Sequence, residues 1–161
     1  MSRMAALVAE AKAAGDPAII AAGIPYSRFL GLSFALAEPA IGASPARGVG
    51  SAILGTLTFS RTIIGNPVLP ALHGGAIGAL LESTAIVELI WMSETPLLPK
   101  TINITIEYLR AGKCVDTFAR ALVTRHGRRV ANVRIEAWQD DMDRPIAIAV
   151  AHFLTVAPPP T

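Results

Sequence analysis

Residues 72–91 read LHGGAIGALLESTAIVELIW, and this stretch decides the fold. From Gly75 onward it is rich in Ala, Leu and Ile and contains no Pro, which predicts a helix. Apolar residues lie on every side of this helix, so we expect it to be buried inside the domain. Its length approaches that of a membrane span. However, Glu82 and Glu88 lie within it and strand-like sequence flanks it, which favours a core helix.

The first unusual feature of the helix is His73-Gly74-Gly75 at its start. Glycine lets another group approach the backbone closely, and the first turn of a helix carries unpaired N–H groups at the positive end of its dipole. Together these features can stabilise a carbonyl oxygen as it gains negative charge. The motif is therefore a candidate oxyanion site.

The second unusual feature is Glu82, an acid in the middle of an apolar helix. A carboxylate beside small side chains has empty space next to it, as at a cavity or a subunit interface. Glu82 is therefore a candidate general base. The alternative is a structural role, in which another residue pairs with the buried carboxylate and the acid takes no part in chemistry. The residues that share its helix face are small or apolar: Gly75, Gly78, Ala79, Ala85 and Ile86.

The spacing of these two features limits how they can act together. Gly74 and Glu82 are eight residues apart, which separates them by roughly 12 Å along a helix axis and about 80° around it. One helix can hardly bring both groups to a single carbonyl carbon. Two copies packed antiparallel would place the glycine of one chain opposite the glutamate of the other. If the site exists, we infer that a dimer forms it.

The composition of the chain limits the kinds of protein it can be. With 161 residues it is one domain with room for a sizeable core. An apolar fraction of 52% and a charged fraction of 16% exclude disorder and favour an oligomer. The net charge of +2 is too small to argue for nucleic acid. The lone Cys114 fits a reducing cytosol, and charges spread along the N-terminal segment favour a soluble helix over a signal peptide.

The order of the remaining segments predicts an α+β architecture. We expect helices at 4–14 and 17–23, a connector at 24–28, strands at 29–38 and 49–61, and loops at 39–47 and 64–70. After the central helix we expect four consecutive antiparallel strands, at 101–109, 115–125, 129–139 and 146–156. Such segregation predicts a meander sheet wrapped around one long helix, which is the outline of a hotdog fold.

Several motifs together resemble the hotdog acyl-CoA thioesterases of the PaaI-like branch of the 4HBT superfamily. The strongest is His73-Gly74-Gly75 with Glu82 nine residues after the histidine, before a buried helix and with four strands behind it. The resemblance runs from about Pro25 to the end of the chain. It also includes the segments Asn66-Pro67, Tyr108-Leu109-Arg110 and Gly127-Arg128-Arg129-Val130.

The resemblance implies roles for individual residues. Glu82 would be the general base or the nucleophile, and the Gly74 N–H would be the oxyanion donor. Gly75 would shape the turn, His73 would position the loop, and Asn66 would orient the substrate carbonyl or the water. Asn66 lies one residue further from His73 than the usual spacing.

Ile86 stands where relatives often carry a helical Ser or Thr, so Ser83 and Thr84 are the nearer polar candidates for contact with the substrate. Members of the family form dimers, often paired into tetramers, with sites across the dimer interface.

The densest basic cluster is Arg125, Arg128 and Arg129, around an expected hairpin. It is either a solvated hairpin that keeps a sheet edge soluble or a grip on the phosphates of coenzyme A. Weaker candidates for that grip are Lys100, Arg110 and Lys113. The three histidines and Cys114 have no metal-ligand spacing, so we expect no metal site.

The sequence thus predicts a hotdog thioesterase domain at 25–157, a helical extension at 1–24 and a flexible tail at 158–161. We expect a cytoplasmic homodimer or homotetramer that hydrolyses an acyl-CoA thioester without a cofactor and without a nucleic-acid or membrane partner. The first alternative is a non-catalytic acyl-CoA-binding or regulatory hotdog protein. The second is a hotdog hydratase, which would pair an Asp with a His in a different motif. The residues are compatible with either the base or the nucleophile role for Glu82.

Overall fold

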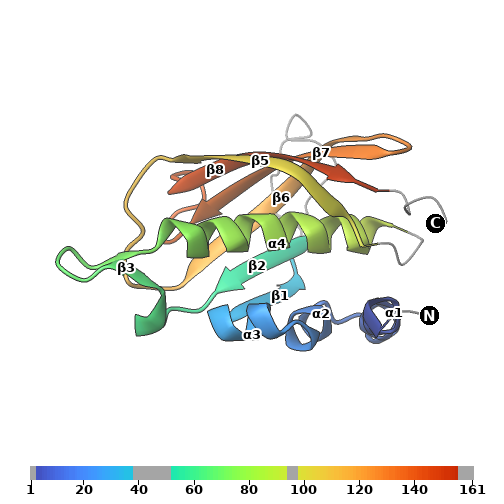
Figure 1. Cartoon of the computed structure of the whole chain (residues 1–161), viewed down its shortest axis with the longest axis horizontal. Helices are drawn as coiled ribbons and strands as arrows, with labels where there is room; N and C mark the ends of the chain where they lie inside the picture. Colours follow the sequence, from blue (N-terminus) through green and yellow to red (C-terminus); the bar gives the residue numbers. More distant parts are fainter. Residues whose placement is uncertain (1–2, 38–51, 94–97, 156–161) are drawn as a thin grey trace.

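The computed structural model describes residues 3–37, 52–93 and 98–155, and it has the hotdog fold. A six-stranded antiparallel sheet curls around one long helix, α4 (Gly74–Met92), while three N-terminal helices lie along one edge (Figure 1). The helices are α1 (Arg3–Ala14), α2 (Ala18–Gly23), α3 (Pro25–Leu30) and the 3-10 turn η2 (Arg61–Ile63). The strands of the large sheet are β1 (Leu32–Leu36), β2 (Ile53–Leu57), β5 (Lys100–Tyr108), β6 (Thr117–His126), β7 (Val130–Trp138) and β8 (Ala147–Leu154).

The strand order of the sheet is β1-β2-β6-β7-β8-β5. Strands β6, β7 and β8 form the expected meander, but the prediction that all four late strands follow one another in the sheet is wrong. Strand β5 pairs with β8, with Thr105 opposite Val150, and so forms an edge of the sheet. The chain between β5 and β6 must therefore cross to the other side of the meander, and it passes the amino end of α4 as it does so.

Small side chains on the inner face of the sheet let α4 lie close to it. Alternate residues of β7, of β8 and of the first half of β6 are buried, and most of these are alanines: Ala119, Ala121, Ala131, Ala137, Ala147, Ala149 and Ala151. The closest approach is at Gly55 of β2, where an added Cβ would come within 2.1 Å of Thr84 Oγ1 on α4. This tight packing fixes the helix against the sheet.

Helix α4 is a core helix, as predicted. It is long and apolar enough to cross a membrane by length and composition, but 56% of its most apolar window is buried inside the domain. Both Leu80 and Leu81 are completely inaccessible to solvent. The residues that stay partly open include Gly78 and Glu82, on the side of the helix next to the edge strand β5.

Glu88, the second acid of the helix, is buried against the sheet. Its side chain is 1% exposed and lies at the start of β2. One carboxylate oxygen accepts a hydrogen bond from the Ala52 N–H at 3.0 Å, and the other accepts one from the Ile53 N–H at 2.9 Å. The carboxylate therefore joins the carboxyl half of α4 to the backbone of β2.

Two local predictions also differ from the structure. The segment expected as a connector forms helix α3, because Pro25 suits its first turn and Gly31 ends it with a left-handed φ of 73°. Strand β1 consequently begins at Leu32 rather than at Phe29. A six-residue helix is too short to show a helical period in the sequence.

The segment before α4 is more regular than expected. Strand β2 ends at Leu57, and Arg61 belongs to η2 rather than to a strand. The expected loop at 64–70 contains β3 (Ile64–Asn66), which pairs with β4 (Ala71–Leu72) in a hairpin that projects at the amino end of α4 (Figure 1). The loop predicted at 39–47 and the tail predicted at 158–161 lie outside the described residues.

The Glu88 contact predicts a large effect on stability. Replacing Glu88 by Ala removes the acceptor of two buried backbone N–H groups, so we expect the free energy of unfolding to fall by about 2–4 kcal/mol. Urea denaturation measures this change. The matched control is Glu10→Ala, because Glu10 is exposed on α1. A loss for Glu88→Ala no larger than that of the control would contradict the structural role of the contact.

Candidate active site

The amino end of α4 is anchored by backbone contacts before its first turn begins. The His73 N–H donates to the Ile63 carbonyl at 2.8 Å, and the Leu72 N–H donates to the Gly112 carbonyl at 3.0 Å. At Gly65 in β3 an added Cβ would lie 2.7 Å from the His73 Cα, so only glycine permits this approach. The start of the helix is thus fixed relative to both neighbouring segments.

The Gly74–Gly75 peptide is held at both its polar groups. The Gly75 N–H donates to His73 Nδ1 at 2.9 Å, which makes His73 the N-cap of α4. On the other side of the same peptide, the Tyr108 hydroxyl donates to the Gly74 carbonyl at 2.7 Å. Within residues 3–37, 52–93 and 98–155, the Gly74 N–H has no acceptor. This N–H group points out of a preorganised turn at the positive end of the helix dipole.

A cavity of about 420 Å³ lies at this end of α4. Helix α4 contributes Gly74 and Ile77, while the end of β5 contributes Tyr108. The remaining wall comes from β4 and from the crossing segment after β5: Ala71, Leu72, Leu109, Arg110, Ala111 and Gly112. The cavity is therefore the space into which a ligand of the Gly74 N–H would extend.

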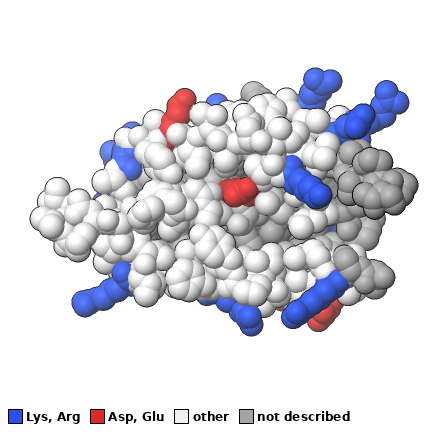
Figure 2. Space-filling view, in the orientation of Figure 1, with Lys and Arg blue, Asp and Glu red and all other residues white. Residues whose placement is uncertain are grey.

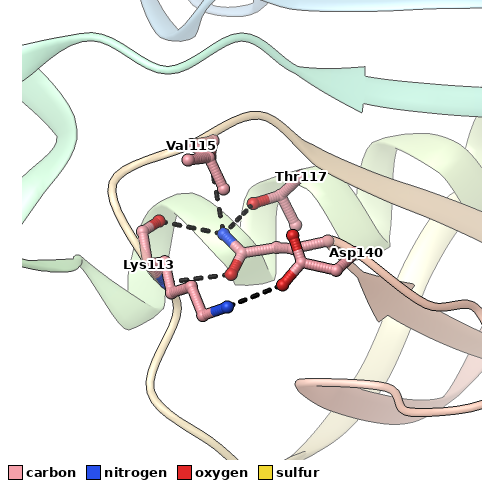
Figure 3. Close-up of polar contacts among 5 residues, drawn as sticks. Lys113, Val115, Thr117 and Asp140 are labelled. Carbon is pink, nitrogen blue, oxygen red and sulfur yellow. Dashed lines mark hydrogen bonds and ion pairs between the residues drawn. The ribbon is translucent and has the colours of Figure 1, made fainter.

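A polar network holds the crossing segment in place (Figure 3). The Gln139 side chain accepts from the Lys113 N–H at 2.9 Å and donates to the Lys113 carbonyl at 2.9 Å and to Thr117 Oγ1 at 3.0 Å. Lys113 Nζ also pairs with Asp140 at 2.6 Å. These contacts fix the wall of the cavity, and they engage Lys113, which was a weaker candidate for phosphate binding.

Glu82 is half-buried in the middle of α4, on the side next to the edge strand β5. Its Oε1 accepts a hydrogen bond from Thr101 Oγ1 at 2.6 Å, so β5 orients the carboxylate. Because Glu82 and Gly74 are two helix turns apart, roughly 12 Å separates them along the axis. A single chain therefore does not bring the acid and the Gly74 N–H together.

The two hydroxyl candidates next to Glu82 have different surroundings. Ser83 is half-buried beside the acid. Thr84 is fully buried, and its hydroxyl donates to the Leu80 carbonyl at 2.7 Å. In this chain Thr84 packs against Gly55 on the sheet side of α4, away from the open face.

Asn66 lies on the exposed β3–β4 hairpin. Its Oδ1 accepts hydrogen bonds from the Val68 N–H at 3.0 Å and the Leu69 N–H at 3.1 Å, which shapes the tip of the hairpin. Both Val68 and Leu69 are largely exposed there. The Asn66 side chain is thus engaged with its own loop.

The three arginines lie at the other end of the molecule. Arg125 is the second-last residue of β6, and Arg128 and Arg129 follow in the β6–β7 hairpin, all of them exposed. This hairpin lies near the carboxyl end of α4, whereas the Gly74 cavity lies at its amino end (Figure 1). Arg110 is close to the Gly74 cavity and donates to the Pro145 carbonyl at 2.5 Å.

Two residues of the site, Tyr108 and Thr101, were not predicted as site residues from the sequence. Both lie on β5, and each donates a hydrogen bond to α4: Tyr108 to the Gly74 carbonyl and Thr101 to Glu82. Side-chain contacts between segments this far apart leave no local pattern in the sequence. Among the described residues, no group of three His, Cys, Asp or Glu side chains is arranged to hold a metal ion.

Comparison with known proteins gives a consistent result. Residues 66–154 match the family model of the acyl-CoA thioesterase N-terminal domain. A crystal structure of a Chromobacterium violaceum protein is 37% identical with a TM-score of 0.69, and the match covers 97% of this chain and 98% of that chain. No protein of curated function matches the chain.

Two further solved structures are similar. One is a candidate thioesterase and phenylacetic acid degradation-related protein from Ralstonia eutropha, 25% identical with a TM-score of 0.65, covering 81% of this chain and 90% of that chain. The other is a Bacillus halodurans protein crystallised with CoA, with 18% identity and a TM-score of 0.60, covering 66% of this chain and 68% of that chain. At 18% identity, the similarity to the Bacillus halodurans protein supports the fold alone.

The contact between Tyr108 and Gly74 predicts an effect on the first turn of α4. In Tyr108→Phe the ring stays but the Gly74 carbonyl loses the hydrogen bond from the Tyr108 hydroxyl. We expect the Gly75 and Ala76 amides to exchange hydrogen about three- to tenfold faster, because such a bond contributes about 1 kcal/mol.

Hydrogen exchange followed by NMR measures these rates. Tyr26→Phe is the matched control, because the Tyr26 hydroxyl is exposed and has no hydrogen bond to any described residue. Equal rates in the two variants would show that Tyr108 does not hold the turn.

Proposed function

Since the chain belongs to the acyl-CoA thioesterase family, we propose that it hydrolyses an acyl-CoA thioester to a free acid and coenzyme A. One observation carries this proposal. The Gly74 N–H has no acceptor among the described residues, and it opens on a cavity of about 420 Å³ at the positive end of α4. A thioester carbonyl oxygen at this N–H would gain a hydrogen bond that strengthens as the oxygen becomes negatively charged.

Glu82 of the partner subunit supplies the second chemical group. As a general base it would take a proton from water while the water oxygen attacks the thioester carbon. The tetrahedral intermediate then collapses, the C–S bond breaks, and the proton passes to the departing sulfur. Attack by the carboxylate itself would form an anhydride that water hydrolyses to the same products. Either route uses only these groups, so we propose hydrolysis without a metal or a redox cofactor.

The dimer in this proposal is supported by two uncovered elements. Within the described residues β5 pairs only with β8, so its other edge has no strand partner there, and β5 carries the exposed Ile102 and Tyr108. The open face of α4 beside it is rich in small residues. Figure 2 shows that this side of the molecule is mostly free of charge, with an acidic group near its centre and basic groups toward its ends. Such a surface fits a second copy of the chain better than solvent.

The position of Gly78 suits an antiparallel crossing of two α4 helices. Gly78 lies midway between Gly74 and Glu82 in the sequence and is only partly buried. A two-fold axis near Gly78 would set Gly74 of each chain opposite Glu82 of the partner subunit. A Cβ at Gly78 would lie 3.0 Å from Ile106 Cδ1 of the same chain, so glycine here lets β5 pack closely against α4 next to the proposed axis. The interface would then contain two identical sites.

The remaining residues of the proposed site would shape it or orient the substrate, without taking part in the proton transfer. His73 would hold the Gly75 N–H so that the turn presents only the Gly74 N–H to the substrate. Ser83, beside Glu82, would contact the substrate, and Thr84 would support it through the packing of α4. Asn66, on the projecting hairpin, would reach the site from its edge and orient the carbonyl or the water.

Replacing Glu82 by Gln tests the proposal. Gln keeps the size of the side chain and an oxygen that can accept from Thr101, so the fold should be retained. We expect the native protein to release thiol from at least one member of a panel of aryl, short-chain and medium-chain acyl-CoAs. In Glu82→Gln the kcat should fall by about 10²–10⁴-fold, the usual contribution of a general base.

Glu10→Gln is the control, because Glu10 is an exposed glutamate on α1. Full activity in a folded Glu82→Gln protein would rule out the role of this acid. A native protein that binds acyl-CoA but hydrolyses none would instead be the non-catalytic binding protein named as the alternative.

A further inference from the structure

The tip of the β3–β4 hairpin is an exposed apolar projection. Val68 is 84% exposed and Leu69 is 73% exposed, more than any other large apolar side chain of the described residues. The hairpin has no charged residue between Arg61 and His73. Figure 2 shows its projecting end free of Lys, Arg, Asp and Glu, in the place where Figure 1 draws the hairpin. Apolar side chains gathered on an exposed projection are typical of an interaction surface.

The tip is held in a fixed shape. The Asn66 side chain accepts hydrogen bonds from the backbone N–H groups of Val68 and Leu69, which closes the turn. The base of the hairpin is joined to the start of α4, because the His73 N–H donates to the Ile63 carbonyl at 2.8 Å. The tip and the first turn of α4 therefore form one unit. A partner that covers the tip would have little conformational entropy to remove.

The hairpin extends past the amino end of α4 (Figure 1). The backbone of residues 71–73 is extended, so the tip lies roughly 10 Å or more beyond Gly74. Gly74 is four residues from Gly78, the position of the proposed two-fold axis, which adds roughly 6 Å. An equal distance along α4 of the partner subunit, roughly 16–21 Å, leads to its last turn, Leu89–Met92.

That end of the molecule carries exposed apolar side chains. Met92, the last residue of α4, is 43% exposed, and Leu98 is 47% exposed. Leu98 precedes Pro99, which lines one cavity together with Leu89 and Ser93, so it lies close to the end of the helix. The hairpin of the same chain cannot cover this surface, because the 19 residues of α4 span roughly 28 Å.

We propose that the tip of each hairpin packs on Met92 and Leu98 of the partner subunit, and that this contact sets the register of the two α4 helices. The inference rests on the antiparallel dimer of the proposed function. Since the hairpin is joined to the Gly74 turn, the contact would hold this turn at the level of Glu82 of the partner subunit. The shared site is incomplete without this contact, although the tip takes no part in the chemistry.

Replacing Leu69 by Asp tests the contact. The side chain is exposed in one chain, so the fold should be retained, but in the dimer a charge would be buried at two equivalent contacts. We expect the dimer dissociation constant to rise at least about tenfold in sedimentation experiments on a dilution series. Leu36→Asp is the control, because Leu36 is half-exposed on β1, at the opposite edge of the sheet from β5. A monomeric native protein, or equal dissociation constants for the two variants, would overturn the proposal.

A second substitution in the same chain identifies the surface that the tip contacts. Adding Met92→Lys or Leu98→Lys to Leu69→Asp would place a cation beside each new carboxylate. At least one of these pairs should recover the dimer severalfold relative to Leu69→Asp alone, whereas Leu36→Lys should not. Because the two positions lie at opposite ends of α4, recovery can arise only between chains. Recovery by neither pair would contradict the proposed contact.

These measurements need no substrate, so they separate the contact from the reaction. If the dimer responds as expected but the native protein hydrolyses no acyl-CoA, the contact stands and the proposed reaction is wrong. If the native protein is active but its dimer is unaffected by Leu69→Asp, the reaction stands and the contact is wrong.

Discussion

The close packing of α4 on the curled sheet fixes every group of the candidate site. Alanines on the sheet and Gly55 let the helix approach, and the Glu88 carboxylate joins its carboxyl half to the backbone of β2. At the other end, His73 and Tyr108 hold the first peptide of the helix. The Gly74 N–H at the start of α4 and the Glu82 carboxylate in its middle remain accessible to a ligand. Because the helix is rigid, neither group can move toward the other.

This separation makes the dimer a chemical requirement of the proposed reaction. Within one chain the Gly74 N–H and the Glu82 carboxylate are too far apart to act on the same thioester carbon. In an antiparallel dimer, Gly74 of one chain would lie next to Glu82 of the partner subunit. A two-fold arrangement would therefore divide the site between subunits, with the oxyanion N–H on one chain and the acid on the other.

The sequence predicted the elements that have a strong local period. The central helix and the alternating strand β5 agree with the structure to within about one residue at most ends. Helix α3 was missed because its signals, Pro25 and Gly31, flank only six residues.

The edge position of β5 depends on its pairing with β8, which is distant in the sequence, so no local sequence pattern predicts it. For Glu88 the difficulty was that a helix apolar on all sides does not reveal which face meets the sheet. The glycine and the acid were identified from their motif, whereas their partners Tyr108 and Thr101 emerged only from the fold.

The most direct test of the account is activity in mixed dimers. One chain carries Glu82→Gln and the other Gly74→Pro, which removes the N–H at a first-turn position where proline fits and where His73 is already extended, with φ −66° and ψ 129°. Gly74→Ala, which adds a Cβ but keeps the N–H, is the control for crowding of Tyr108. Each variant alone should be inactive, while the purified mixed dimer has one intact site and should recover about half of the native activity. A mixed dimer as inactive as its parents would contradict a site shared between two chains.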